Sequence, residues 1–164
     1  MPTQSWTPEQ TLAAVRDLAA SPGAPADRLQ RLLQLIHDHH PHYEWLGLYL
    51  LRGATLALGP YVGAATEHTR IPVGVGVCGT AVAERRNQRI ADVRKLTNYL
   101  ACSAAVRSEI VVLIWDGDRV LGQIDADCDA VGAFTAADEA FLEAVARLVA
   151  PVVADLTALG DSPG

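Results

Sequence analysis

Three cysteines fall between Gly74 and Cys128, and each has a different chemical setting. Cys78 ends the glycine-rich segment Gly74-Val75-Gly76-Val77-Cys78, which predicts a tight turn leading into a helix. A thiol in the first turn of a helix lies near free amide groups and the positive end of the helix dipole, which lower its pKa. Cys78 is therefore a candidate for redox chemistry on a small molecule. A small buried residue at a helix start is the equally open alternative.

The other two thiols differ in what surrounds them. Cys102 stands in an expected loop beside Ala101 and Ser103, and small neighbours leave a thiol accessible to a substrate. An incidental loop cysteine is the alternative for this residue. Cys128 directly follows Asp127 at the end of an expected strand, so repulsion by nearby carboxylates is expected to raise its pKa. We interpret Cys128 as a bystander.

Three carboxylates lie at or near the ends of two expected strands. Asp125 and Asp127 alternate along one strand, so they share a face, while Ile124 and Ala126 point the other way into a core. Glu109 begins the neighbouring strand. Three acids on one side of a sheet could bind an ammonium group, and one kept protonated by burial could donate a proton to a leaving oxygen. A solvated sheet face is the alternative.

Two aromatic residues accompany the acids. Trp45 and Tyr49 are four positions apart on an expected strand, so both point to one face. They could wall a pocket for a cationic or thioether ligand, or simply pack under a loop.

Other motifs carry less chemistry. The histidines in His37-Asp38-His39-His40-Pro41-His42 could bind zinc, but histidine is common at a helix end before proline, and no metal site is expected. The glycine segment at 74–79 matches neither a dinucleotide fingerprint nor a phosphate loop. No Ser-His-Asp arrangement can be picked out.

The elements that must position these residues follow from local patterns. Helices are expected over about 7–20, from about 29 to Pro41, over 80–84, and from Thr135 onward, where Thr135 and Asp138 form a capping box. Two hairpins are expected, with turns at 52–53 and 116–118, and a short strand at 89–91. Residues 63–70 and 92–107 are expected to be loops. The order predicts an α+β domain, an antiparallel sheet with helices on one face and a loop-lidded pocket on the other.

Composition narrows the class of protein. The chain has 164 residues, half of them hydrophobic, which suffices for one domain with a full core. The formal net charge of −6, without a basic cluster, argues against nucleic acid or an anionic membrane as partner. The N-terminus shows no signal-peptide pattern, so we expect a cytoplasmic protein with reduced thiols.

Beyond these local arguments, the chain resembles free methionine-(R)-sulfoxide reductases, which are stand-alone GAF domains. The resemblance covers about 43–149 and rests on an ordered set of segments, namely Trp45-Leu46-Gly47-Leu48-Tyr49, Leu58-Gly59-Pro60-Tyr61, Gly76-Val77-Cys78-Gly79-Thr80-Ala81, Ala101-Cys102, Ser108-Glu109-Ile110-Val111-Val112 and Ile124-Asp125-Ala126-Asp127. It implies one GAF domain over 1–164, with a helical segment at about 7–40 and a core at about 43–150.

The resemblance also implies a reaction. A thiolate attacks the sulfoxide sulfur of free methionine sulfoxide, an acid protonates the oxygen, and a sulfenic acid remains on the enzyme. A second thiol then forms a disulfide with the oxidised cysteine, and thioredoxin reduces that disulfide with electrons from NADPH. The enzyme itself needs no bound cofactor. Carried onto this chain, Cys102 attacks and Cys78 resolves. Homodimers are common in the family.

The resemblance further assigns the remaining site residues. Glu109, Asp125 and Asp127 bind the substrate ammonium group and the sulfoxide oxygen, and Trp45 and Tyr49 wall the pocket around the methyl-sulfur end.

The chain departs from the family pattern at His68, where many members have a further cysteine ten residues ahead of Cys78. Cys78 or an external thiol must then resolve the sulfenic acid. The helix-start argument makes Cys78 the thiol of lower pKa, so the identity of the attacking thiol is open. The rival interpretation is a non-catalytic GAF module that binds a small molecule or senses redox state.

Overall fold

The computed structural model describes residues 5–97 and 105–160. In chain order, the elements are α1 Pro8–Ala20, α2 Pro25–His39, β1 Trp45–Arg52, β2 Thr55–Val62, β3 Arg70–Pro72, α3 Gly76–Glu84, β4 Gln88–Ile90, the 3-10 helix η1 Val93–Lys95, β5 Ser108–Asp116, β6 Arg119–Cys128 and α4 Ala136–Gly160. The strands form one antiparallel sheet in the order β3-β2-β1-β6-β5-β4. The α+β architecture expected from the sequence is confirmed.

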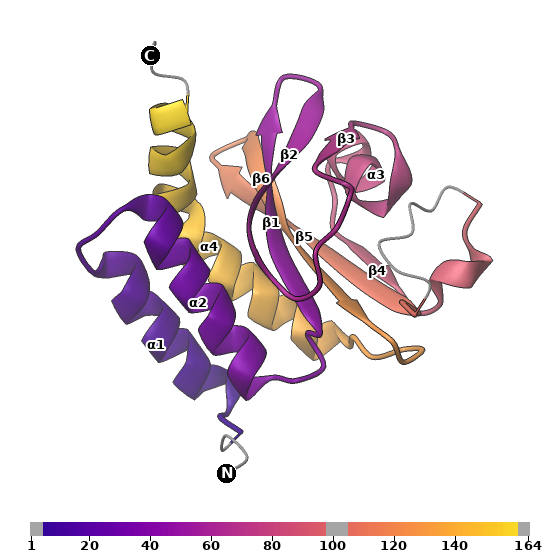
Figure 1. Cartoon of the computed structure of the whole chain (residues 1–164), viewed down its shortest axis with the longest axis horizontal. Coiled ribbons are helices and arrows are strands. Elements are labelled where there is room, and N and C mark those ends of the chain that lie inside the picture. Colours follow the sequence, from indigo (N-terminus) through magenta and orange to yellow (C-terminus); the bar gives the residue numbers. More distant parts are fainter. Residues whose placement is uncertain (1–4, 98–104, 161–164) are drawn as a thin grey trace.

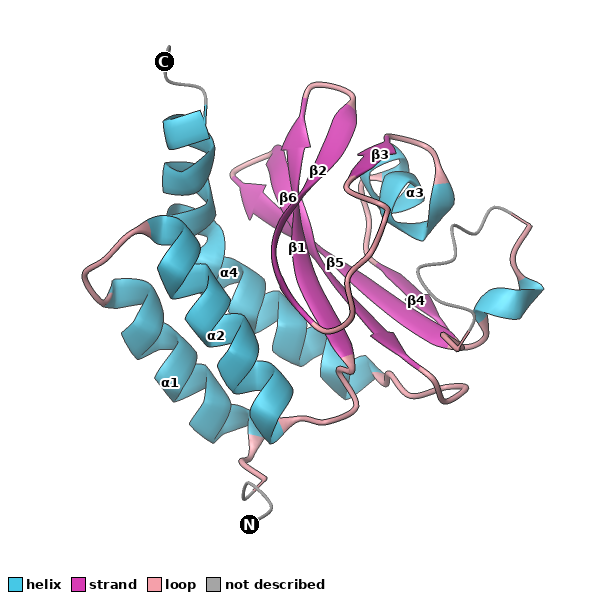
Figure 2. Cartoon of the chain, in the orientation of Figure 1, coloured by secondary structure: helices cyan, strands magenta, loops and turns pink. Residues whose placement is uncertain are grey.

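The sheet separates two apolar clusters. On one face α2 and α4 pack against the strands, and α1 packs against these two helices (Figures 1 and 2); their apolar cluster includes Ile124 and Ala126 of β6. On the other face α3 covers the sheet beside its loops, over a smaller cluster that includes Trp45, Tyr49 and Cys78. The second face therefore carries a short helix in addition to the expected loops.

Local chemistry explains the element boundaries. Thr7 caps α1 in a capping box with Gln10, and Pro8 occupies the first turn. Thr135 and Asp138 cap each other at the start of α4. Gly53 and Gly117 adopt φ values of 62° and 60° in the two hairpin turns, which glycine tolerates best. These features match the expectations from the sequence.

Four elements differ from the expectations. Helix α3 begins at Gly76 rather than Thr80, so Cys78 lies within its first turn. Strand β2 continues to Val62, and residues 70–72 form the edge strand β3 in a segment partly expected to be loop. The expected loop at 92–107 contains η1, and its residues 98–104 lie outside the described part of the chain. Among the described helices, none is long and apolar enough to cross a membrane.

Candidate active site

Strands β5 and β6 bring the three predicted acids onto one face of the sheet. Asp125 and Asp127 alternate along β6, and Glu109 of β5 pairs with Asp127 in the antiparallel register. All three are buried, with exposed fractions of 4% for Glu109, 1% for Asp125 and 2% for Asp127. The alternative of a solvated sheet face is therefore wrong.

The first turn of α3 places Cys78 against these acids. Its thiol donates to Glu109 Oε2 at an Sγ–O distance of 3.8 Å. The backbone carbonyl of Cys78 accepts a hydrogen bond of 3.0 Å from Nε2 of Gln123, a fully buried side chain of β6. The sequence interpretation missed Gln123, although the same alternation that places Asp125 also places this residue two positions earlier on the same face.

The expectation that the helix start lowers the pKa of Cys78 is wrong. Burial raises the pKa of this thiol well above its usual range, and the charges of Asp125, Glu109 and Asp127 raise it further. One turn of helix dipole is a weak effect beside complete burial among three carboxyl groups. Cys78 is therefore a protonated thiol in the ligand-free protein.

Burial also acts on two of the acids. It raises the pKa of Asp125, and it raises the pKa of Asp127 well above the usual range with help from the charge of Asp125. Glu109 lies close enough to both groups, and Cys78 to Asp125, to lower their pKa values in part, but within the described residues no oxygen of either carboxyl group has a partner at full hydrogen-bond geometry. Buried polar groups are normally paired, so this arrangement is typical of a site that receives a ligand.

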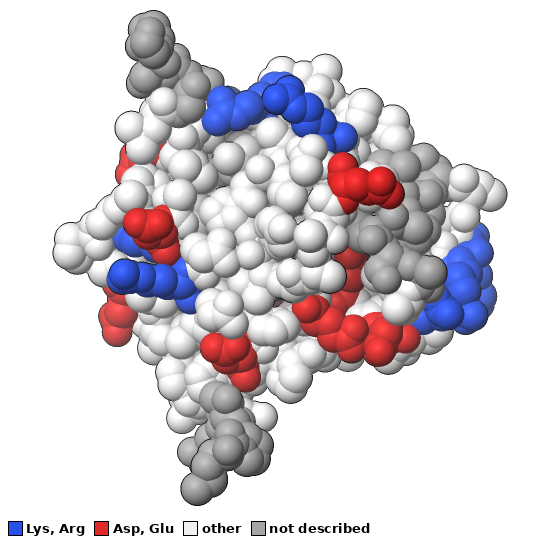
Figure 3. Space-filling view, in the orientation of Figure 1, with Lys and Arg blue, Asp and Glu red and all other residues white. Residues whose placement is uncertain are grey.

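Two cavities open onto this face. One, of about 160 Å³, is lined by Trp45, Asp127 and Cys128 together with residues 64–66 and 105–106. The other, of about 10 Å³, is lined by Tyr49, His68, Cys78, Glu109 and Asp125 among others. On the surface shown in Figure 3, acidic side chains gather around a hollow, whereas Lys and Arg lie toward the margins.

Trp45 and Tyr49 lie on the same face as the acids, as the sequence predicted. Their ring centroids are 6.3 Å apart. The indole of Trp45 donates to the carbonyl of Ala64 at 3.0 Å, and the hydroxyl of Tyr49 donates to the carbonyl of His68 at 2.9 Å. These two bonds fix both rings to the loop that follows β2, so the rings form rigid walls of the two cavities.

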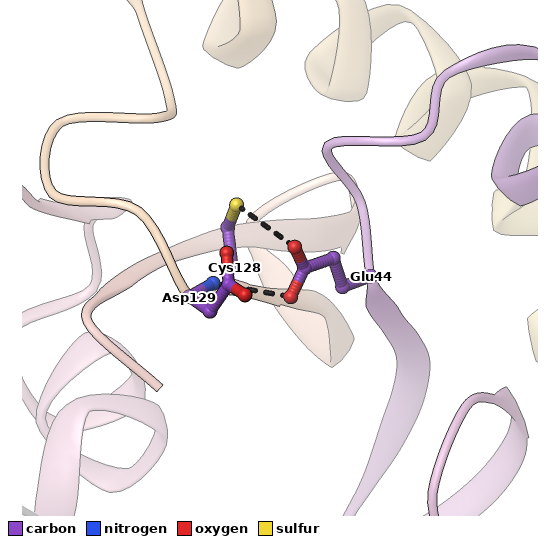
Figure 4. A group of neighbouring side chains, drawn as sticks. All are labelled: Glu44, Cys128 and Asp129. Atoms are coloured by element: carbon purple, nitrogen blue, oxygen red, sulfur yellow. Dashed lines mark hydrogen bonds between the residues drawn. The ribbon is translucent and has the colours of Figure 1, made fainter. Parts of the chain in front are cut away.

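Cys128 lies at the edge of the larger cavity with Glu44 and Asp129 (Figure 4). Its thiol donates to Glu44 Oε1 at 3.7 Å, and the backbone N–H of Asp129 donates to Glu44 Oε2 at 3.1 Å. Burial raises the pKa of Cys128, and Glu44 adds to the increase. The direction matches the expectation, but the neighbouring acids are Glu44 and Asp129 rather than Asp127.

The remaining predicted residues fall elsewhere. Cys102 lies outside the described residues. Two histidines of segment 37–42 form hydrogen bonds with different side chains and do not converge on one point. His40 Nε2 lies 2.7 Å from Thr11 Oγ1, and His42 Nε2 lies 2.7 Å from Asp138 Oδ1. In the described part of the chain, the groups that could hold a metal ion contain no histidine.

Comparison with known proteins agrees with this geometry. The GAF domain family matches residues 24–153. The chain is 41% identical over 120 residues to the free methionine-R-sulfoxide reductase of Escherichia coli. The aligned residues cover 73% of this chain and 72% of the relative.

Solved structures of similar proteins extend the likeness to the fold. The reduced form of the Staphylococcus aureus fRMsr has a TM-score of 0.83 at 34% identity, covering 93% of this chain and 99% of that one. The free methionine-R-sulfoxide reductase of Neisseria meningitidis, in complex with its substrate, has a TM-score of 0.86 at 26% identity, covering 97% and 99%. With a thiol, three buried acids and two aromatic walls on one face of its sheet, the chain belongs to the GAF domain family and, within it, to the free methionine-R-sulfoxide reductases.

Proposed function

We propose that this protein reduces free L-methionine-(R)-sulfoxide to L-methionine by thiol chemistry. The observation that carries the proposal is the buried group of Glu109, Asp125 and Asp127 beside the Cys78 thiol. An amino-acid substrate brings an ammonium group, which supplies the positive charge that buried carboxylates require. A zwitterionic amino acid therefore fits this face better than an apolar or anionic ligand.

The proposed first step joins one thiol and one sulfoxide. The Cys102 thiolate attacks the sulfoxide sulfur, a buried carboxylic acid protonates the oxygen, and the products are methionine and a Cys102 sulfenic acid. Asp127 is the candidate for the proton donor, because burial raises the pKa of this carboxyl group well above its usual range. The raised pKa of Cys78 disfavours this residue as the attacker and so supports the assignment of Cys102.

The proposed second step regenerates the thiols. The Cys78 thiol condenses with the sulfenic acid, which forms a disulfide and releases water. The hydrogen bond that Glu109 accepts from Cys78 supports a role for Glu109 in taking the thiol proton in that step. Thioredoxin, itself reduced with NADPH, then reduces the disulfide. This route requires a reducing compartment, so the proposed location is the cytoplasm. A homodimer is the proposed assembly.

Trp45 and Tyr49 complete the proposed substrate site. Their rings line the two cavities beside the acids and would hold the methyl-sulfur end of the substrate by contact with the thioether and methyl groups. Replacement of Trp45 by leucine tests this role. We expect a KM for free methionine sulfoxide raised by about tenfold, because the loss of an aromatic–sulfur contact and part of the apolar wall is worth roughly 1–1.5 kcal/mol.

A ligand-binding GAF module that does no chemistry is the competing function. Both functions predict binding of an amino acid, but only the enzyme releases methionine. Turnover of free methionine sulfoxide, followed for each sulfur epimer separately, therefore distinguishes them. Turnover of the R epimer alone supports the proposal, and binding without release of methionine would contradict it.

A further inference from the structure

One buried cluster has the geometry of a metal site. The Cys78 Sγ atom, a carboxylate oxygen of Glu109 and one of Asp125 all lie within 4.8 Å of one another, and all three residues are buried. The Sγ–Oε2 distance between Cys78 and Glu109 is 3.8 Å. Zinc in a tetrahedral site lies about 2.3 Å from sulfur and about 2.0 Å from oxygen, which separates neighbouring ligand atoms by roughly 3.3–3.7 Å. Small side-chain movements would therefore close this cluster around an ion.

A second observation favours a cation at this cluster. Asp125 is 1% exposed, and both of its carboxyl oxygens lack a hydrogen-bond partner within the described residues. Gln123, next along the same strand face, is fully buried, and its Oε1 atom also lacks a partner there. Unpaired buried oxygens are unfavourable, and a cation stabilises them directly. The cavity beside them is small, about 10 Å³, which is room for one water-sized particle such as an ion.

We propose that the reduced, substrate-free protein binds a thiophilic divalent cation of the zinc class at Cys78, Glu109 and Asp125. On binding, the Cys78 thiol transfers its proton to solvent and its sulfur bonds the metal, so one metal–sulfur bond forms as one S–H bond breaks. Three protein ligands leave a fourth position for water. The thiolate selects zinc-like ions over magnesium or calcium, which prefer oxygen ligands alone.

The metal and the substrate would exclude one another. This part rests on the proposed function, because it requires that Glu109 and Asp125 receive the substrate ammonium group and that Cys78 is the resolving thiol. The bound ion would then act as a competitive inhibitor, and oxidation of Cys78 to a disulfide would release it. Metal binding itself does not depend on the proposed function.

The second thiol cluster supplies a matched control. Glu44, Cys128 and Asp129 also lie close enough to share an ion, but Glu44 and Asp129 are exposed, and the Glu44 carboxylate already accepts bonds from the Cys128 thiol and the Asp129 backbone. Replacement of Cys128 by serine therefore removes a thiol of the same protein without touching the proposed ligands.

Cobalt titration of the chelator-treated, reduced protein tests the site without substrate. We expect one equivalent of Co²⁺ to produce thiolate-to-cobalt charge-transfer absorption, which Zn²⁺ then abolishes by displacement. The absorption should be absent in Cys78→Ser and unchanged in Cys128→Ser. Asp125→Asn should bind about 10- to 150-fold more weakly, because it loses a charged ligand worth roughly 1.5–3 kcal/mol. Urea unfolding of each variant confirms that it is folded.

Three results would overturn the proposal. These are absence of charge-transfer absorption in the wild type, its persistence in Cys78→Ser, and its loss in Cys128→Ser. The competitive part is tested separately in the metal-free enzyme with and without added Zn²⁺. An apparent KM for methionine sulfoxide that rises with Zn²⁺ supports it, and an unchanged KM contradicts it. Failure of turnover in the metal-free enzyme would instead refute the proposed function and leave the cobalt result standing.

Discussion

Replacement of Asp125 by asparagine should stabilise the fold and impair the reaction. Asp125 is almost fully buried, and its two carboxyl oxygens have no partner in the described residues. An unsatisfied buried group costs about 1–3 kcal/mol, and more when it is charged. Because burial raises the pKa of Asp125, the folded protein must either keep a desolvated charge there or take up a proton, and both cost free energy at neutral pH. A neutral amide of the same shape avoids both costs, so we expect the free energy of unfolding to rise by about 1–3 kcal/mol. With a urea m-value of about 2 kcal/mol/M, the unfolding midpoint should rise by roughly 0.5–1.5 M.

The same substitution should weaken substrate binding. A hydrogen bond to a charged group is worth about 1.5–3 kcal/mol, so loss of the ammonium contact should lower kcat/KM by about 10- to 150-fold. The contact exists in both the bound substrate and the transition state, so most of the loss should fall on KM. Steady-state kinetics with free methionine sulfoxide and urea unfolding with a chelator present measure the two effects on one preparation.

Asp116 offers the matched control, since this exposed acid on β5 pairs with Arg119 away from the cavities. Asp116→Asn should change the free energy of unfolding by less than about 0.5 kcal/mol and leave the kinetics unchanged. A loss of stability in Asp125→Asn, or an unchanged kcat/KM, would refute the reasoning. The first result would mean that Asp125 is structural, and the second that the ammonium group binds elsewhere.

Three further predictions concern other residues. Gly122→Ala should destabilise the fold by about 1–3 kcal/mol in urea unfolding, because its Cβ would lie 2.2 Å from the backbone oxygen of Tyr49 in the neighbouring strand; wild-type stability would show that β1 and β6 can separate. Burial alone would raise the pKa of Asp138, but hydrogen bonds from Thr135, His42 and Tyr43 hold it below its usual value. The depressed pKa stabilises the fold at pH values above the unfolded pKa of about 3.9, and this stabilisation is lost as the pH falls through the folded pKa. In Asp138→Asn the free energy of unfolding should therefore fall less steeply with decreasing pH in the acid range. An unchanged dependence on pH would contradict this role of Asp138. Cys128→Ser should keep wild-type turnover in the methionine-release assay, and a loss of more than tenfold would make Cys128 part of the reaction.

Local patterns predicted much of the site. Asp125 and Asp127 share a face because strand side chains alternate, and the alternation is readable from the sequence. The same rule placed Trp45 and Tyr49 together. Glu109 could be assigned to the neighbouring strand because the turn at 116–118 fixes a hairpin register.

What the sequence missed depends on packing between distant segments. The pKa of Cys78 rises because α3 lies over carboxylates from β5 and β6, and the local helix-start argument contains no information on them. The start of α3 at Gly76 was missed because glycine has low helix propensity, which tertiary contacts override here. The edge strand β3 has three residues and includes Pro72, so it carries almost no periodic signal.

The central claim is that thiols of this protein reduce one epimer of free methionine sulfoxide. The direct measurement is methionine released from the separated R and S epimers by the wild type and by Cys102→Ser, with either thioredoxin and NADPH or dithiothreitol as reductant. The account predicts turnover of the R epimer alone, supported by thioredoxin and abolished in Cys102→Ser. Methionine release from neither epimer with either reductant, by a protein that still binds methionine sulfoxide, would contradict it and favour a ligand-binding GAF module.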